Sequence, residues 1–175
     1  RLLRLQQSDR LLEVGCGYGR LLWHLRPLAG SVVGMDLHDG PLVEARELLR
    51  SMRNAEFILG DGQTLAPIQD NSIDKVVAFT VLQHMSRVGV CRYLDEMRRV
   101  LTPGGLGVVN FHDDGVRSSH MLDKPEEQSL AWSPSQICAA ADTAGIVIRS
   151  LERETLEDLY PGRNLVWWWL TFSAE

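Results

Sequence analysis

The sequence predicts a doubly wound α/β fold around a mostly parallel sheet, and its first 36 residues carry most of that prediction. The apolar residues 11–14 lead into a glycine-rich turn, and a helical pattern begins at Arg20. A second apolar run, residues 32–35, ends in Asp36. The order strand, glycine turn, helix, strand and acid is that of the opening βαβ unit of a nucleotide-type site. Strand and helix patterns then alternate along the chain, as they do in folds of this class.

The glycine turn and the acid have the properties of a ligand site. Gly15, Gly17 and Gly19 allow positive φ angles and let a ligand approach where a Cβ would collide. The helix that follows presents unpaired N–H groups, which suit an anionic group such as a carboxylate or phosphate. Asp36 lies 21 residues beyond Gly15, a spacing at which a carboxylate can accept hydrogen bonds from a ribose diol.

The spacing of the glycines separates the possible nucleotides. The motif is G-x-G-x-G, and Arg20 follows Gly19, so the dinucleotide pattern G-x-G-x-x-G is not met. Leu37 and His38 follow Asp36 with no nearby arginine to hold a 2′-phosphate, which argues against NADP. A nicotinamide-dependent oxidoreductase is therefore disfavoured.

Two motifs resemble the class I S-adenosylmethionine-dependent methyltransferases. Residues 13–19, EVGCGYG, match the family's first motif, which looks like (D/E)-x-G-x-G-x-G. Residues 96–109, EMRRVLTPGGLGVV, are very like the segment that joins the fourth helix of the family to its fifth strand. The resemblance is closest to the broad methyltransferase type 11 group and covers residues 9–111. It implies a seven-stranded, mostly parallel Rossmann-like sheet with an antiparallel last strand, and S-adenosylmethionine as the cofactor.

The resemblance also implies a set of cofactor-binding residues at the carboxyl ends of the strands. Asp61 follows the expected strand 55–59 and would accept a hydrogen bond from the adenine amine, with Gly62 beside the ring; the alternative is that Asp-Gly is simply a turn. Backbone groups of Phe79 and Thr80 would line the pocket near the methyl group. The implied cofactor-binding residues are Glu13, Gly15, Cys16, Gly17, Gly19, Asp36, Leu37, Asp61, Gly62, Phe79 and Thr80.

Two histidines are the candidate catalytic residues. His84 and His112 both follow strands whose carboxyl ends face the expected pocket, and either can supply a general base or merely begin a polar loop. Methyl transfer from a sulfonium depends mainly on alignment, so a base is needed only if the nucleophile must lose a proton. The histidines and cysteines have no zinc-type spacing, and we expect no metal.

Composition limits the domain count and the partners. The 175 residues suit a single domain, with residues 1–9 as a short helix or remnant of an N-terminal cap and residues 112–132 as a rim loop. The net charge of −5 comes without a basic run, so a nucleic-acid partner is disfavoured. Three widely spaced cysteines suggest a reducing compartment, hence the cytoplasm, and neither a membrane span nor a signal peptide is found. The oligomeric state stays open.

The remaining patterns complete the expected fold. Residues 39–52 predict a helix with Leu42, Ala45, Leu48, Leu49 and Met52 on its buried face. Strands are expected at 73–79, 106–111, 146–151 and 165–172, and helices at 87–101, 134–144 and 154–160. Ser133 and Gln136 form a capping box, and Gly145 ends that helix. Trp167–Trp169 are expected as core fillers rather than an aromatic cage or base-stacking platform.

The sequence thus predicts a methyltransferase that transfers a methyl group from S-adenosylmethionine to an O, N or C nucleophile, with a small molecule as the acceptor. Two alternatives stay open. One is methylation of a protein, and the other is a catalytically silent subunit that binds the cofactor for a regulatory purpose.

Overall fold

The computed structural model describes residues 2–113, 130–155 and 166–174, and its centre is a sheet with the strand order β3-β2-β1-β4-β5-β8-β7. Strand β8 runs antiparallel between β5 and β7, and the other neighbours along the path pair in parallel. The strands are β1 (Arg10–Val14), β2 (Ser31–Asp36), β3 (Ala55–Leu59), β4 (Ile73–Ala78), β5 (Leu101–Asp113), β6 (Ala131–Trp132), β7 (Val147–Thr155) and β8 (Val166–Ser173). This architecture confirms the predicted fold class. The sheet has eight strands rather than seven because the two-residue β6 adds to the end of β5.

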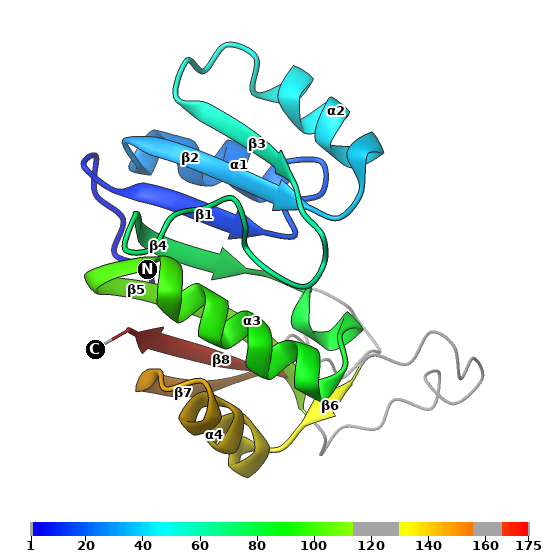
Figure 1. Cartoon of the computed structure of the whole chain (residues 1–175), viewed down its shortest axis with the longest axis vertical. Helices are drawn as coiled ribbons and strands as arrows, with labels where there is room; N and C mark the ends of the chain where they lie inside the picture. Colours follow the sequence, from blue (N-terminus) through cyan, green and yellow to red (C-terminus); the bar gives the residue numbers. More distant parts are fainter. Residues whose placement is uncertain (1, 114–129, 156–165, 175) are drawn as a thin grey trace.

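Helices lie on both faces of the sheet. Helices α3 (Arg87–Val100) and α4 (Pro134–Thr143) cover the near face in Figure 1, whereas α1 (Arg20–Leu25) lies behind β1 and β2 and α2 (Asp39–Leu48) lies beside β3. Two short 3₁₀ turns, η1 (Arg26–Leu28) and η2 (Leu82–His84), follow α1 and β4. Because β1, β2, β3 and β4 are parallel, their carboxyl ends share one edge of the sheet, where ligands bind in open α/β sheets.

The core on the near face includes residues of α3 at helical spacing. Val90, Leu94 and Met97 of α3 are fully buried against the sheet. At the start of α3, the Ser86 hydroxyl accepts a hydrogen bond from the backbone N–H of Gly89. Burying these three side chains removes several hundred Å² from water, at about 25 cal/mol per Å², and this fixes α3 beside the end of β4.

The predicted capping box of α4 is confirmed. The Ser133 hydroxyl accepts from the backbone N–H of Gln136, and the Gln136 side chain accepts from the backbone N–H of Ser133. Pro134 occupies the first turn, and Gly145 takes φ +66° after the last turn. A left-handed residue at this position is the usual helix ending.

Two helical expectations near the amino terminus were wrong. The first residues form turns, because Arg4 has φ +48° and the Asp9 carboxylate accepts from the backbone N–H of Gln6. In α2, Leu48 is exposed and Leu49 takes the buried position, because Leu49 already lies beyond the last helical residue. The helix therefore turns a narrower apolar face inward than the sequence suggested.

Strands β5 and β7 are longer than predicted. Strand β5 begins at Leu101, which pairs with Ile73 before the register shifts. Strand β7 continues through Glu154 and Thr155, so the acidic helix expected from residue 154 does not begin there. The rest of that helix, and residues 114–129 of the expected rim loop, lie outside the described residues.

The three tryptophans alternate across β8 and pack against the core on both faces of the sheet, as expected of core fillers. Trp168 packs against the core beneath α3 and α4. Trp167 and Trp169 face the other side, where Trp167 is buried and Trp169 packs against the core, and both also line an open groove. The reason for the groove is the position of α1, which lies over the β1 half of the sheet and leaves this half of the face to the tryptophans (Figure 1).

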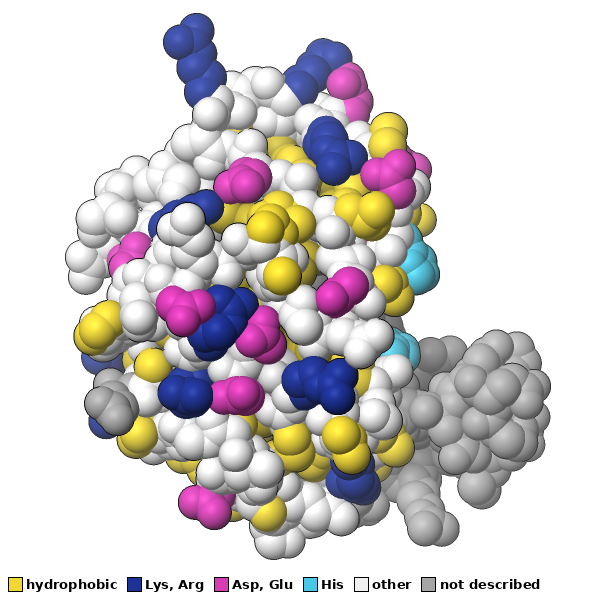
Figure 2. Space-filling model, in the orientation of Figure 1, with side chains coloured by type: hydrophobic (Ala, Val, Ile, Leu, Met, Phe, Trp, Pro, Cys, Tyr) yellow, Lys and Arg dark blue, Asp and Glu magenta, His cyan; other side chains and the backbone are white. Residues whose placement is uncertain are grey.

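The surface over α3 carries both signs of charge. Arg98 pairs with Asp95 at 2.8 Å, and Arg99 pairs with Glu96 at 2.8 Å and with Asp70 at 2.6 Å. Basic and acidic side chains lie next to one another across this face (Figure 2). Within the described part of the chain, no helix is long and apolar enough to cross a bilayer.

Candidate functional site

The glycine turn between β1 and α1 is fixed to the end of β2. Gly15, Gly17 and Gly19 have φ angles of +70°, +50° and +74°, so each occupies the left-handed region that favours glycine. The backbone N–H groups of Gly15 and Cys16 both donate to the carbonyl oxygen of Met35, at 2.7 and 3.0 Å. The turn is therefore held by hydrogen bonds before any ligand arrives.

Asp36 forms a second link between the same two strands. One carboxylate oxygen accepts from the backbone N–H of Gly17 at 2.8 Å, and the other accepts from the backbone N–H of His38 at 2.9 Å. Each oxygen keeps a further lone pair, so the carboxylate can also accept from a ligand. The predicted ribose acceptor thus lies directly beside the glycine turn.

A cavity of about 310 Å³ opens at this edge of the sheet. Four segments surround it: Gly15 of the turn, Asp36 and Leu37 after β2, Gly60 and Gly62 after β3, and the segment from Thr80 to Met85 after β4. Tyr93 of α3 also lines it, a residue that the sequence analysis did not select. Its place among the buried positions of α3 gave it the appearance of a core residue.

Asp61 is engaged in its own turn. Its oxygens accept from the backbone N–H groups of Gln63 and Thr64, each at 2.7 Å, and from the Thr64 hydroxyl at 2.9 Å. These bonds lower the pKa of the Asp61 carboxyl, which is ionised at neutral pH. The neighbouring Gly62 has φ +70° and lies against Leu37, so its bare α-carbon forms part of the cavity wall.

Glu13 lies beneath the glycine turn and is almost fully buried. Burial raises the pKa of its carboxyl to about 8; the Leu22 N–H opposes this rise, and the negative charge of Asp36 adds to it. One of its carboxyl oxygens has no hydrogen-bond partner within the part of the chain that the structure describes. Glu13 is therefore mostly protonated at pH 7 in the ligand-free protein.

Cys16 is also buried within the turn. Burial raises the pKa of its thiol to about 12, and the negative charges of Glu13 and Asp36 contribute to the rise. A Cβ at Gly34 would lie 2.8 Å from the Cys16 sulfur, so the thiol fills the space above that glycine. Its position is that of a small packing residue.

Phe79 and Thr80 follow β4 and separate two cavities. Thr80 lines the cavity beside Gly15, with its backbone at φ +58°. The backbone N–H of Thr80 donates to the side-chain oxygen of Asn110 at 2.7 Å. Asn110 is fully buried and was not selected from the sequence; a single amide within the apolar strand 106–111 was the signal that could have found it.

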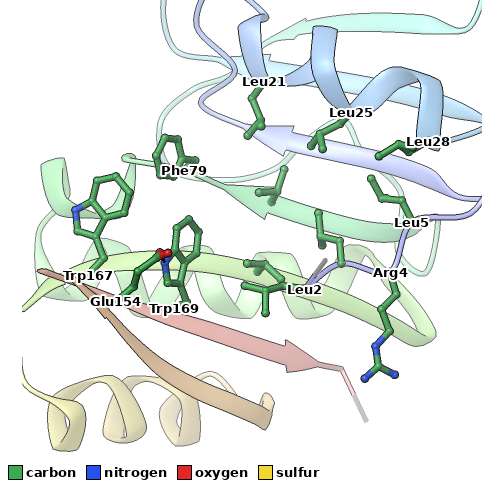
Figure 3. Close-up of a pocket in the computed structure, with 13 residues that line it drawn as sticks. Leu2, Arg4, Leu5, Leu21, Leu25, Leu28, Phe79, Glu154, Trp167 and Trp169 are labelled. Carbon is green, nitrogen blue, oxygen red and sulfur yellow. Dashed lines mark hydrogen bonds between the residues drawn. The ribbon is translucent and has the colours of Figure 1, made fainter. Parts of the chain in front are cut away.

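The Phe79 side chain turns away from the cofactor cavity and lines the groove behind the sheet. The ring stacks on Trp169, with centroids 5.7 Å apart, and meets Trp167 edge-on at 5.1 Å. The groove has a volume of about 670 Å³, and Leu21 and Leu25 of α1 form its opposite wall (Figure 3). Its lining is predominantly apolar.

The two candidate histidines have different surroundings. His84, on η2, lines the cavity beside Thr80. His112, on β5, is half-buried and stacks on Trp167, with ring centroids 6.5 Å apart. Burial lowers the pKa of His112, and the nearby His84 lowers it further. His112 is therefore neutral at pH 7 and able to accept a proton.

Metal ligands do not gather in the described ranges. No group of three or more His, Cys, Asp or Glu residues is placed to hold a metal ion among residues 2–113, 130–155 and 166–174.

A family model described as a methyltransferase domain matches residues 12–109, which include the glycine turn, Asp36, Asp61 and Thr80. The chain belongs to this methyltransferase family. The resemblance inferred from the motifs is confirmed, and S-adenosylmethionine is the cofactor that goes with it. The site fits this cofactor: three glycines line the cavity, and the Asp36 carboxylate among them suits a cationic sulfonium.

Individual relatives share the domain but extend beyond it. An uncharacterized 37.1 kDa protein of transposon Tn4556 from Streptomyces fradiae is 32% identical over 154 residues, covering 86% of this chain and 43% of its own length. A fatty-acid O-methyltransferase of Mycolicibacterium smegmatis is 32% identical over 152 residues, covering 84% of this chain and 51% of its own. The chain therefore spans about half the length of these relatives.

A solved structure shows the same fold over the whole chain. The YcgJ protein of Bacillus subtilis superposes with a TM-score of 0.79 at 17% identity, covering 99% of this chain and 95% of that one. At this identity the likeness concerns the fold alone. It extends to the antiparallel end of the sheet, which the family model does not include.

Proposed function

We propose that residues 1–175 form one domain that transfers the methyl group of S-adenosylmethionine to an O, N or C nucleophile of a small molecule. The observation that carries the proposal is the glycine turn, because Asp36 and Met35 hold it open beside a cavity of about 310 Å³. The family's cofactor needs such a bare, negatively charged edge.

Each part of the cofactor has residues suited to it. Asp36 would accept from the ribose hydroxyls, and Gly17, where a Cβ would meet no atom within 4 Å, leaves room for the ligand beside the backbone. Asp61 and Gly62 would border the adenine, and the backbone of Thr80 would lie nearest the methyl group. These assignments extend the cavity geometry to the bound state.

The chemistry supplied by the cofactor is a methyl group on a positively charged sulfur, which an acceptor displaces in line. The protein's contribution is to align the two and to exclude water. Where the acceptor is a hydroxyl, His112 or His84 would take its proton, and the low pKa of His112 keeps that imidazole neutral. With an amine or carbon acceptor, a base is needed only if the nucleophile must lose a proton.

A small-molecule acceptor is favoured over a protein by two observations. The fatty-acid O-methyltransferase of M. smegmatis aligns over most of this chain. Phe79, His112 and Trp167 form a compact aromatic edge beside the end of β4, a surface suited to one small apolar body.

The three free cysteines agree with a reducing compartment, and we place the protein in the cytoplasm on that ground.

Calorimetry with S-adenosylhomocysteine tests the cofactor site. We expect micromolar binding, weakened about tenfold or more in Asp36→Ala, because a charge-assisted hydrogen bond is lost together with the contact to Gly17. Asp36→Asn should bind with intermediate strength. Asp39→Ala, which removes an exposed acid in the first turn of α2, should bind like the wild type. Equal binding by wild type and Asp36→Ala would refute the site.

Transfer of label from methyl-labelled cofactor separates the alternatives. Label in the small-molecule fraction of a cell extract supports the proposal, and label in the protein fraction supports a protein methyltransferase instead. Tight binding with no transfer to either fraction is the result expected of a silent cofactor-binding subunit.

A further inference from the structure

The backbone of Thr80 adopts an unusual conformation at the edge of the cofactor cavity. Its φ of +58° lies in the left-handed region, which is costly for a β-branched residue. Thr80 is the second residue after Ala78, the last residue of β4, where the chain leaves the sheet and turns toward η2. Something in the surrounding structure must hold this conformation.

Asn110 holds Thr80 in this conformation through a hydrogen bond. The last parallel pair between β4 and β5 joins Ala78 to Val109, so the sheet ladder ends one residue before Asn110. The Asn110 side chain continues the ladder in place of a backbone group, because its oxygen accepts from the Thr80 N–H at 2.7 Å. Asn110 is fully buried, which gives the amide a single, well-defined position.

The other half of the Asn110 amide is unsatisfied. Its side-chain nitrogen is buried without a hydrogen-bond partner among the described residues. A buried, unpaired donor lowers stability, and an apolar residue would avoid that cost. Asn110 is present despite this cost, which indicates that its side-chain oxygen is needed to accept the hydrogen bond from Thr80.

The position of Thr80 is transmitted to the glycine turn through Val81. The Val81 side chain occupies the space beside Gly15 that a Cβ would otherwise fill. Thr80, Val81 and Gly15 all line the same cavity. Asn110 is therefore linked to Gly15 by its hydrogen bond to Thr80, by the strained backbone of Thr80 and by the packing of Val81 on Gly15.

We propose that Asn110 is a positioning residue for methyl transfer, which holds Thr80 in its left-handed conformation and so sets the width of the cofactor cavity beside Gly15. This role rests on the proposed function, since it concerns the same site. Asn110 acts through Thr80 and Val81 and does not itself touch the cofactor.

The test is a double-mutant cycle with two readouts: calorimetric affinity for S-adenosylhomocysteine, and hydrogen exchange of the Thr80 amide in the ligand-free protein. Asn110→Ala should weaken binding about fivefold to tenfold, the effect of one lost hydrogen bond, and should speed Thr80 exchange by a similar factor. In a Thr80→Gly background the same substitution should cost much less affinity, because glycine adopts φ +58° without strain. Asn110→Asp keeps an acceptor oxygen in place and should retain both properties.

Thr171→Val is the matched control. Thr171 lies on the neighbouring strand β8, and its buried hydroxyl has no hydrogen-bond partner in the described ranges, so its replacement removes a polar group of similar burial. Affinity and Thr80 exchange should stay at the wild-type values.

The outcomes separate the two proposals. Undiminished binding in Asn110→Ala, or an equal loss in the wild-type and Thr80→Gly backgrounds, would overturn the positioning role, because the effect would then come from packing. Should Asn110→Ala fail to fold, loss of Thr80 protection in Asn110→Asp would overturn it as well. Wild-type protein that binds no S-adenosylhomocysteine but shows the expected exchange pattern would refute the proposed function and leave the Asn110–Thr80 link established.

Discussion

The side chain of Val81 covers the bare α-carbon of Gly15, in the space that a Cβ at that position would occupy. The contact joins the first strand's turn to the segment after the fourth strand. Glycine is required at position 15 for two reasons, its φ of +70° and this contact. The shape of the cofactor cavity therefore depends on a packing contact as well as on backbone conformation.

Alanine at Gly15 should damage both stability and binding. The new methyl group would overlap Val81 in addition to the strained φ, so we expect a loss of about 2–4 kcal/mol in the free energy of unfolding. Alanine at Gly17 meets no protein atom within 4 Å, so only the φ strain of about 1 kcal/mol remains. Urea unfolding measures the difference, and calorimetry should show weak cofactor binding in both variants. Equal stability losses would contradict the Val81 contact.

Glu13 should make the stability of the ligand-free protein fall as the pH rises. Its pKa is raised from 4.5 to about 8, so between these values the native state keeps a proton that the unfolded state has lost. The shift corresponds to on the order of 5 kcal/mol of destabilisation, complete only above pH 8. Glu13→Gln should therefore raise the melting temperature at pH 8 and change it little at pH 4.

Glu44→Gln serves as the control for that prediction, because Glu44 lies exposed on α2. Its melting temperature should follow the wild type at every pH. A Glu13→Gln curve parallel to the wild-type curve would show that Glu13 is ionised in the native state.

The three cysteines should differ sharply in reactivity. The pKa of Cys16 is about 12, so about one molecule in ten thousand carries the thiolate at pH 8. Cys138 is exposed and should react first with a disulfide reagent, and Cys138→Ser should abolish that first phase. Cys16 should become reactive only on unfolding. Labelling of Cys16 in the native protein would show that the turn opens.

Local patterns revealed the glycine turn and Asp36 because these parts of the candidate site belong to one βαβ unit. The turn from Gly15 to Gly19 and the acid at Asp36 are signals within one βαβ unit, and the structure joins them by a direct hydrogen bond. The capping box of α4 was predictable for the same reason, since Ser133 and Gln136 are three residues apart. In both cases the residues that interact belong to one local motif, a βαβ unit for Gly17 and Asp36 and a helix start for Ser133 and Gln136.

Contacts between residues far apart in the chain could not be predicted from local sequence patterns. Pro103-Gly104-Gly105 indicates a turn, and only the pairing of Leu101 with Ile73 extends β5 in front of it. The partner of Asn110 is Thr80, 30 residues away, and an isolated amide does not reveal which backbone group it will meet. The placement of Trp167 and Trp169 on one face of β8 was predictable, because residues two apart in a strand share a face. The groove that they line depends on the position of α1.

His84 should make a secondary contribution to the low pKa of His112. Burial lowers the pKa of His112 first and the charge of His84 second, so His84→Gln should raise the His112 pKa while leaving it below 6.5. Because the native state then takes up protons at higher pH, the loss of stability on acidification should also be smaller. NMR titration of the imidazole signals measures the shift, and His24→Gln, on the exposed surface of α1, should leave it unchanged. An unmoved His112 titration in His84→Gln would mean that burial alone keeps this candidate base neutral.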